Sequence, residues 1–336
     1  MMELNYVQKA AYELIQADAR FLYTLCVIQQ KAKNISSNYM MMSQPYIGVF
    51  ADGSEQWCRK IGMSAPKFTE EEKKYYSILR ESHKFFELPC RECLSILKKK
   101  LQESDAYFYS IRGPLERIIG YYNVGTDLYE GEFCGNTILA ALYLPVEVLN
   151  NNGIGLWIRD ISVVAGKLAA FFECTNFKPY RYDVNASVRY KDYHFYKNCP
   201  ISNRTDLGFL LFSVLCSVNY AIKFIDGFFL DEIPQKFKFA YLQYFYLCSF
   251  IPKINVEHGT QLFINDSLKD RKFRNCLAHY GLGQYLSESD LCLNDPLKGL
   301  TQKAFNMDYN VAKEKLYLYL RELVNQVKTL IDLKTN

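Results

Sequence analysis

Two side chains on one short segment could together bind a phosphate and transfer a proton. Arg274 and His279 stand five residues apart in RKFRNCLAHYG, residues 271–281, and the whole chain has only four histidines. A histidine with an ordinary pKa near 6.5 can take up or release a proton near neutral pH. A guanidinium can hold two oxygens of one phosphate. Arg271 and Lys272 make this vicinity positive although the formal net charge of the chain is only +4.

The helix that carries these side chains is expected to end at Gly281, because glycine favours the left-handed conformation just past a helix. Residues five apart on an ideal helix point about 140° away from each other. We therefore expect one copy of the chain to hold Arg274 and His279 apart and a second copy to complete the site. The other interpretation of His279 is a helix-end histidine that hydrogen-bonds to the last-turn carbonyls and is stabilised, when charged, by the helix dipole.

The residues that follow a linker at 198–203 have the pattern of a four-helix bundle. The expected helices cover residues 207–230, 234–250, 266–280 and 308–333. The third carries Arg274 and His279. The fourth carries an apolar stripe at three- and four-residue steps, formed by Leu316, Leu320, Leu323, Val327 and Leu330. This stripe can bury itself against the bundle or against a second copy.

The first of these helices is long and apolar enough to span a membrane. Asn219, Lys223 and Asp226 interrupt its second half, however, and a buried bundle helix explains the pattern better. The N-terminal segment carries Glu3, Glu13 and Asp18 and lacks a continuous apolar stretch, so it does not resemble a signal peptide. Eleven cysteines without repeated spacing indicate reduced thiols. We expect a soluble, cytoplasmic protein without a membrane partner.

The first two hundred residues are expected to be mostly helical. Helices are predicted at residues 4–33, after a Thr69–Glu72 capping box, after Pro89, and at 139–150 and 155–173. Residues 40–67 hold two prolines and three glycines and are predicted to be a loop.

Between residues 178 and 197 the helical pattern fails. Alternate residues from Tyr182 to Tyr190 are apolar or aromatic, which predicts a short strand or hairpin. The fold class is therefore mainly α. A predominantly helical domain of residues 1–200, with a short β-hairpin, precedes a four-helix bundle of residues 201–336.

The pattern Arg274-Asn275-x-x-Ala278-His279 resembles the R-x4-6-H motif of the HEPN superfamily, helical-bundle domains of which many are metal-independent ribonucleases. A polar residue directly after the arginine is the common form of that motif. The resemblance implies a HEPN-like bundle in the C-terminal part and RNA as the partner. It also implies a homodimer in which two motifs face each other through the bundle, and it does not extend to residues 1–200.

The chemistry that this resemblance implies needs no cofactor and no metal. The 2′-OH of RNA attacks the adjacent phosphorus, and the products carry a 2′,3′-cyclic phosphate and a 5′-hydroxyl. His279 would manage the proton and Arg274 would stabilise charge on the phosphate oxygens. Asn275 would orient His279 or hydrogen-bond to the phosphate. Arg271, Lys272 and Tyr280 are assigned to RNA binding.

Two classes of function follow. In the first, the bundle is an RNA-cutting effector, such as an antiviral or stress-response toxin, and residues 1–200 regulate it or position its substrate under an inhibitory or activating partner. In the second, the bundle is a non-catalytic HEPN-like module that binds a nucleotide or a protein. Phosphate-binding glycine loops and the metalloprotease and serine-hydrolase motifs are missing from the sequence, which argues against those enzyme classes.

Two other groups of residues could carry chemistry. Cys90 and Cys93 form a C-x2-C pair preceded by His83, but a second pair for a four-ligand zinc site is lacking, and a reduced pair at a helix start is favoured. Residues 178–197 interleave basic residues with tyrosines, a composition that suits unpaired bases. A solvated strand with tyrosines packed on one face is the favoured alternative.

Overall fold

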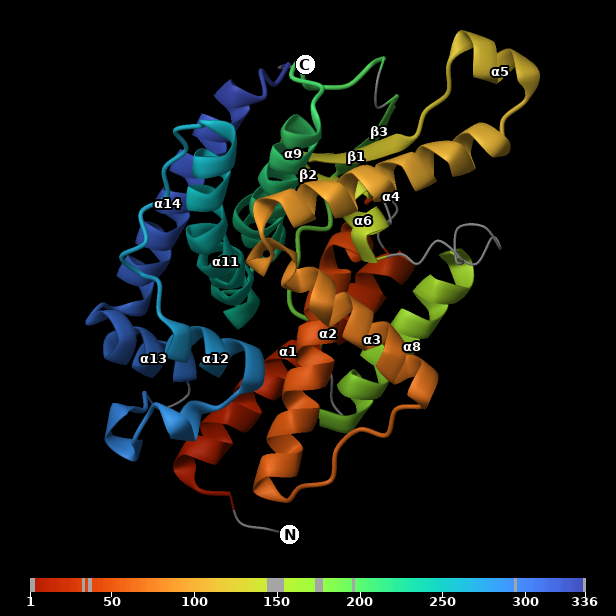
Figure 1. Ribbon diagram of the computed structural model, residues 1–336. Helices are drawn as coiled ribbons and strands as arrows, with labels where there is room; N and C mark the ends of the chain where they lie inside the picture. The colour runs from red at the N-terminus through yellow and green to blue at the C-terminus, as the bar shows by residue number, and fades with distance from the viewer. Residues whose placement is uncertain are drawn as a thin grey trace.

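The structure is a computed structural model that describes residues 4–31, 34–35, 38–143, 154–172, 178–194, 197–292 and 295–334. The described chain is mainly helical and contains a small antiparallel sheet (Figure 1). The fold class predicted from the sequence is confirmed at this level.

Helices make up most of the N-terminal part. They are α1 (Tyr6–Lys31), α2 (Asn38–Ile61), α3 (Glu70–His83), the 3-10 turn η1 (Phe85–Glu87), α4 (Cys90–Ser110), α5 (Pro114–Ile119), α6 (Thr137–Tyr143) and α8 (Ile154–Phe172). The capping box is confirmed, because the Thr69 side chain accepts from the Glu72 amide at 3.2 Å and the Glu72 carboxylate accepts from the Thr69 amide at 2.8 Å. The predicted helix at 139–150 is seen as α6 up to Tyr143, and its remainder lies outside the described residues.

Helix α2 overturns the predicted loop up to residue 61, whereas residues 62–67 are non-helical as predicted. Its sequence reads as a loop because it holds Pro45 and two glycines, yet it is helical from Asn38 to Ile61. At both glycines, another helix packs directly against the α2 backbone. A Cβ at Gly48 would collide with the backbone of α3, and a Cβ at Gly53 would collide with the carbonyl of Ala278 in α12. Tertiary packing therefore outweighs the local helix penalty of these residues.

The sheet has the strand order β2-β1-β3, with β1 (Val124–Tyr129), β2 (Glu132–Asn136) and β3 (Val188–Tyr193) all antiparallel to their neighbours. Glu130 and Gly131 join β1 to β2 with φ of 51° and 81°, as a tight hairpin turn requires. Of the two alternatives for residues 178–197, a strand is observed, as β3, but it begins at Val188 and not near Tyr182, and its partner strand is β1. Sequence patterns did not predict β1 and β2.

The tyrosines of residues 178–194 mostly pack inside the protein. Tyr180 and Tyr193 are buried, and Tyr182 stacks on Phe228. Tyr190 alone among these four is well exposed, at 43%. The packing interpretation of this segment is therefore supported for three of its described tyrosines.

The described C-terminal part contains the four expected helices, two 3-10 turns and one further short helix. Its elements are α9 (Asp206–Asn219), the π-helical η2 (Tyr220–Ile225), α10 (Asp226–Phe228), α11 (Pro234–His258), α12 (Arg271–His279), the 3-10 turns η3 (Leu282–Gln284) and η4 (Glu288–Asp290), α13 (Pro296–Phe305) and α14 (Tyr309–Leu330). The first expected helix corresponds to α9, η2 and α10 in succession. Helix α13 was not predicted.

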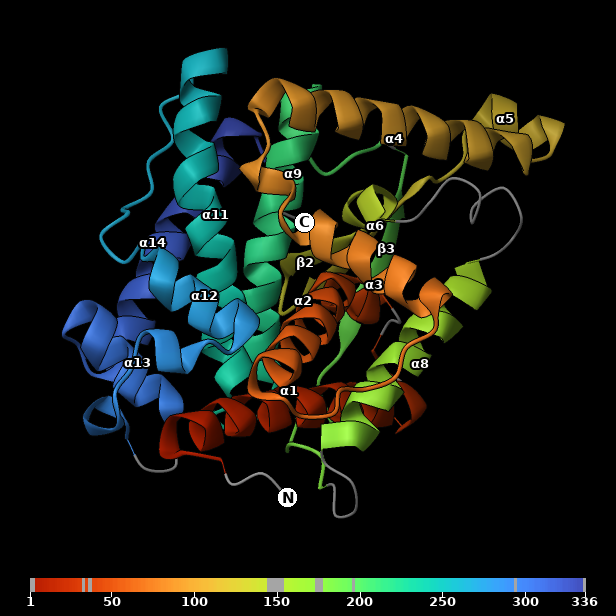
Figure 2. The same ribbon diagram turned by 60° about the horizontal axis from the view of Figure 1, so that its bottom comes forward.

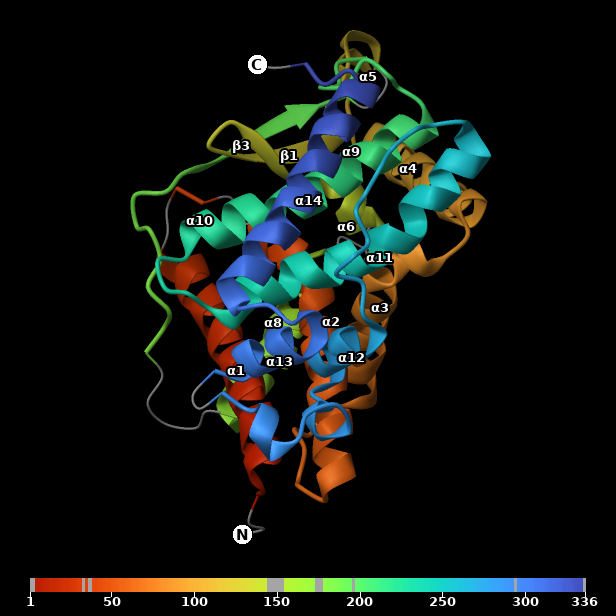
Figure 3. The same ribbon diagram turned by 90° about the vertical axis from the view of Figure 1, so that its left-hand side faces the viewer.

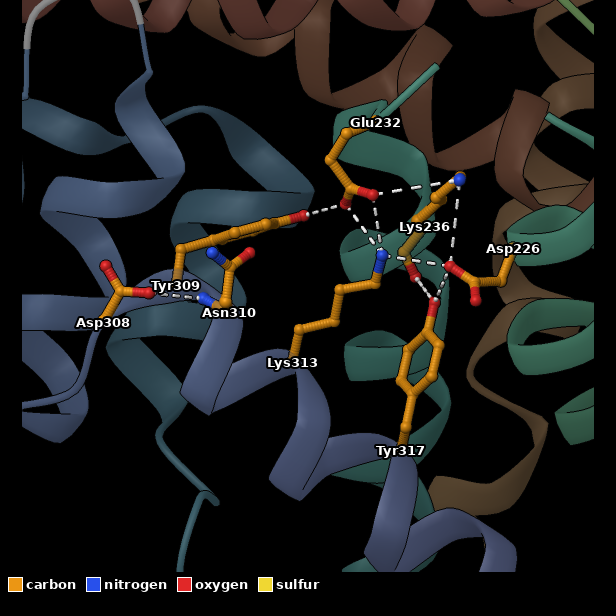
Figure 4. A network of polar contacts seen from close by, with 8 residues as sticks. All are labelled: Asp226, Glu232, Lys236, Asp308, Tyr309, Asn310, Lys313 and Tyr317. Carbon is orange, nitrogen blue, oxygen red and sulfur yellow. Dashed lines mark hydrogen bonds and ion pairs between the residues drawn. The ribbon is translucent and has the colours of Figure 1, made fainter. Parts of the chain in front are cut away.

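The apolar segment Asp206–Phe228 is long and hydrophobic enough to cross a membrane, but 89% of its most apolar window is buried inside the protein. Two of its interrupting polar side chains have partners there. Asn219 donates to the Phe133 carbonyl at 3.0 Å, and Asp226 accepts from Lys313 at 3.0 Å. Figure 4 shows how Asp226 joins a network of charged and tyrosine side chains from α11 and α14. This segment is a core helix, as its interrupting polar residues predicted.

Helix α14 uses its apolar stripe inside the molecule. Leu316, Leu320, Leu323 and Val327 are fully buried, and the helix lies against α9 and α11 (Figure 3). Of the two alternatives for this stripe, burial within the bundle is the one observed. The stripe is consequently not available as a surface for a second copy.

One continuous cluster of buried hydrophobic residues runs from Val7 to Ile331. The two regions that the sequence suggested, 1–200 and 201–336, both contribute to it. Helix α2 lies between α3 on one side and α12 on the other (Figure 2). The N-terminal region thus positions the helix that carries Arg274 and His279.

Candidate functional site

Helix α12 is fixed at its start by hydrogen bonds to its own cap and to α11. The Asp270 side chain accepts from the Phe273 amide at 2.7 Å, which caps the helix. The Tyr241 hydroxyl on α11 donates to the Leu268 carbonyl at 2.8 Å and accepts from the Asp270 amide at 2.9 Å. These bonds end the preceding turn, so the helix begins at Arg271 and not near Asp266 as predicted.

The end of α12 differs from the prediction by one residue. Tyr280, not Gly281, takes the left-handed conformation, with φ of 53°. The Tyr280 ring is 1% exposed, and its hydroxyl donates to Asp18 and accepts from Lys238 at 3.3 Å. Burial of the ring holds a non-glycine residue in this strained conformation. The assignment of Tyr280 to RNA binding is not supported, because no face of the ring is open to a base.

Arg274 and His279 line the same cleft of one chain. The cleft has a volume of about 310 Å³ and is lined by Arg80, Lys84, Glu87, Phe245, Arg271, Arg274 and His279. The ideal-helix divergence of about 140° describes the directions of the Cβ atoms only. Because the long arginine side chain reaches around the helix and His279 is its last residue, the two still reach one space. The expectation that a single copy keeps them apart is therefore wrong.

The Arg274 guanidinium is held by neighbours on three sides. It donates to the Asn275 side chain at 3.0 Å and to the Tyr246 hydroxyl, and it lies 3.5 Å from the Glu87 carboxylate. The side chain is 12% exposed. Asn275 therefore orients the arginine, in contrast to the predicted contact with His279 or phosphate. The guanidinium is preorganised at the wall of the cleft.

One ring nitrogen of His279 is buried and unpaired. This nitrogen, Nδ1, has no hydrogen-bond partner among the described residues. That nitrogen therefore lacks the bond to a last-turn carbonyl that the alternative interpretation required. Burial lowers the pKa of His279 to about 4, and nearby positive charges, Arg274 first among them, act in the same direction. These effects outweigh the helix dipole, so the ring is neutral at pH 7.

The charge of the cleft comes from three elements. Of the seven lining residues, four are arginine or lysine and one is glutamate. Arg80 and Lys84 come from α3 and its end. The sequence did not identify either residue, because no local pattern shows that α3 and α12 line the same cleft. Arg271, which the sequence analysis assigned to RNA binding, lines the cleft. Lys272 is exposed but is not among the lining residues.

The cysteine pair is not arranged as a metal site with His83. The Cys93 thiol donates to the Phe85 carbonyl at 3.2 Å. The His83 ring is buried between the rings of Tyr46 and Tyr246. Within the described ranges, a different group, Cys90 with Glu257 and His258, brings its ligand atoms within 4.8 Å of one another. None of these three residues lines the cleft.

Comparison with protein-family models, curated proteins and solved structures finds no match for this chain. The interpretation of the cleft therefore depends on its geometry and charge. A neutral histidine and a preorganised guanidinium line one cationic hollow, an arrangement that can bind a phosphodiester and accept a proton beside it.

Proposed function

We propose that the protein is a metal-independent endoribonuclease of the HEPN type. The observation that carries the proposal is that the unpaired, neutral His279 and the oriented Arg274 line one cationic cleft. The phosphate backbone of RNA is the polyanion that such a cleft suits. The cleft is open enough, at about 310 Å³, to admit a phosphate and its neighbouring ribose.

In the proposed reaction, the 2′-oxygen of RNA attacks the adjacent phosphorus while His279 accepts the hydroxyl proton. The bond from phosphorus to the 5′-oxygen breaks, and water supplies a proton to the departing oxygen. The products are a 2′,3′-cyclic phosphate and a 5′-hydroxyl. Arg274 stabilises the charge that develops on the non-bridging oxygens. When RNA binds, its phosphate replaces Glu87 as the anion beside this guanidinium.

The proposed setting is the cytoplasm. The ten cysteines in the described part of the chain are all free, which suits a reducing compartment. By the resemblance, the enzyme would act as an antiviral or stress-response toxin under an inhibitory or activating partner. The N-terminal region would position the substrate, since α3 supplies Arg80 to the cleft.

Cleavage is expected to persist in excess EDTA and to leave cyclic phosphate ends. The reason is that the proton acceptor and the phosphate ligand are both side chains of the cleft. Purified protein would be incubated with labelled RNA, with and without the chelator, and the ends identified by their response to acid and to phosphatase. Abolition of cleavage by EDTA, with restoration by Mg²⁺, would contradict the proposal.

The acid limb of the pH profile is expected to report His279. Because only the neutral ring accepts a proton and its pKa is about 4, kcat/KM should be level between pH 5 and 7. Below about pH 4 it should fall tenfold per pH unit. The profile would be measured with circular dichroism at each pH to confirm folding. A midpoint near 6.5 would instead indicate an exposed, ordinary histidine.

On the basis of the family resemblance, we also propose a homodimer that forms through the C-terminal bundle. Each chain nevertheless has its own cleft, lined by both Arg274 and His279. Mixing Arg274→Ala with His279→Ala protein tests whether the sites are shared. A composite site predicts recovery of up to half the wild-type activity in the heterodimers, since one of the two sites would be complete. Sedimentation would show whether the mixed species is a dimer. Independent clefts, or a monomer at the active concentration, would give no recovery.

A second candidate function rests on the partners of Arg274. Tyr246, Asn275 and Glu87 hold the two terminal nitrogens of this guanidinium in place. A guanidinium fixed in this way would also suit a non-catalytic module that binds a nucleotide phosphate. Tight binding of a nucleotide without any RNA cleavage, in wild type and His279→Ala alike, would favour this alternative.

A further inference from the structure

We propose that Cys90, Glu257 and His258 bind a zinc ion where α4 begins and α11 ends. The three residues offer a sulfur, an oxygen and a nitrogen that all lie within 4.8 Å of one another. They come from two segments far apart in the chain that lie next to each other in space (Figure 2). This site is separate from the cleft and does not rest on the proposed ribonuclease activity.

The distances need only a small closure to fit a metal. Ligand atoms of a tetrahedral zinc site, at 2.0–2.3 Å from the ion, are about 3.5 Å apart. His258 is the last residue of α11 and is exposed, so its ring can move toward the other two. Cys90 is fully buried and supplies the fixed ligand. Three protein ligands leave a fourth position for water.

The charges also suit a divalent ion. A thiolate and a carboxylate neutralise the two positive charges of zinc, and a neutral imidazole adds none. Without a metal, the carboxylate of Glu257 is left partly unpaired. Its Oε2 atom is buried and lacks a hydrogen-bond partner among the described residues. The nearest cation to this atom is the Arg91 Nε, at 3.5 Å. The Arg91 side chain is 90% exposed and can swing away. A bound cation would satisfy the buried carboxylate oxygen.

The neighbouring cation Lys253 is already occupied, because its ammonium donates to the carbonyls of Glu87 at 3.0 Å and Leu88 at 3.2 Å. It joins α11 to the turn just before Cys90. A metal would make a second connection between the same two segments. Because Glu87 lines the cleft, zinc would stabilise one of its walls. We expect zinc to raise the melting temperature and to leave the chemistry of the cleft unchanged.

Cobalt(II) supplies the test, since a cobalt–thiolate bond gives a charge-transfer absorption that oxygen and nitrogen ligands do not give. Reduced, metal-free protein would be titrated with Co²⁺ and then with Zn²⁺. Wild type should show the band, saturate at one equivalent and lose the band to zinc. Cys93→Ser is the matched control, because Cys93 is equally buried but bonds to the Phe85 carbonyl; it should keep the band.

Cys90→Ser should lose the band, and His258→Ala and Glu257→Gln should each weaken binding at least tenfold. His258 is exposed, so its variant tests the site even if the buried cysteine variant fails to fold. Zinc should raise the melting temperature of wild type and Cys93→Ser only. A band that survives Cys90→Ser, that disappears in Cys93→Ser, or that His258→Ala leaves at full affinity would overturn this site.

Discussion

Replacing His279 by alanine should lower the rate of RNA cleavage at least hundredfold, and Arg274→Ala should do the same. General-base catalysis and stabilisation of phosphate charge are each worth about 10²- to 10⁴-fold. Folding should survive, because the His279 Nδ1 has no partner to lose within the described structure and Arg274 packs at the cleft wall, not in the core. Single-turnover cleavage of labelled RNA measures the effect, with circular dichroism as the check on folding.

Arg321→Ala is the matched control. Arg321 is an exposed arginine on α14 and does not line the cleft, so its removal lowers the net charge equally while sparing the site. It should change the rate less than threefold. Cleavage by His279→Ala at the wild-type rate, in protein that folds, would exclude His279 as the proton acceptor.

The largest loss of stability should come from Asp18→Asn. The Asp18 carboxylate accepts from Lys238 at 2.5 Å, from Gln235 at 2.8 Å and from the Tyr280 hydroxyl, all in the core. Neutralising it leaves the Lys238 ammonium, 4% exposed, without a counter-charge. Breaking such a buried pair costs about 3–5 kcal/mol. Urea denaturation followed by circular dichroism would measure the change in the free energy of unfolding.

The sign of the pH dependence follows from Lys238. Burial lowers its pKa, and Asp18 opposes that shift. In the variant, the folded state must release the Lys238 proton while the unfolded chain keeps it up to about pH 10. The stability loss should therefore shrink as the pH rises toward 10.

Asp231→Asn is the comparison variant, because it removes an ion pair at the surface. The Asp231 Oδ1 lies 2.7 Å from the Arg181 Nε, and the Arg181 side chain is 76% exposed. A surface pair contributes at most about 1 kcal/mol. If both variants lost equally little stability, the buried pair would not hold Tyr280 and the end of α12 in place.

The candidate site could be predicted only in part. The local sequence identified Arg274 and His279 as candidates, because both residues lie within the continuous segment 271–281 and are five positions apart. It could not identify Arg80, Lys84 or Glu87, whose place in the cleft depends on how α2 packs against both α3 and α12. It also misplaced Tyr280, because the bond to Asp18 spans 262 positions.

The sequence by itself determined the helices with strong local signals. The capping box before α3, the proline before α4 and the apolar stripe of α14 depend on neighbours within a few residues, so a local pattern carries them. Tertiary structure decided the features that need distant partners. Helix α2 exists despite Pro45 because its glycines meet two other helices, and the sheet needs β1 to pair with a strand sixty residues away. The cleft that Arg274 and His279 both line also exists only in the folded chain. The low pKa of His279 has the same origin, because the fold buries the ring and brings cations close to it.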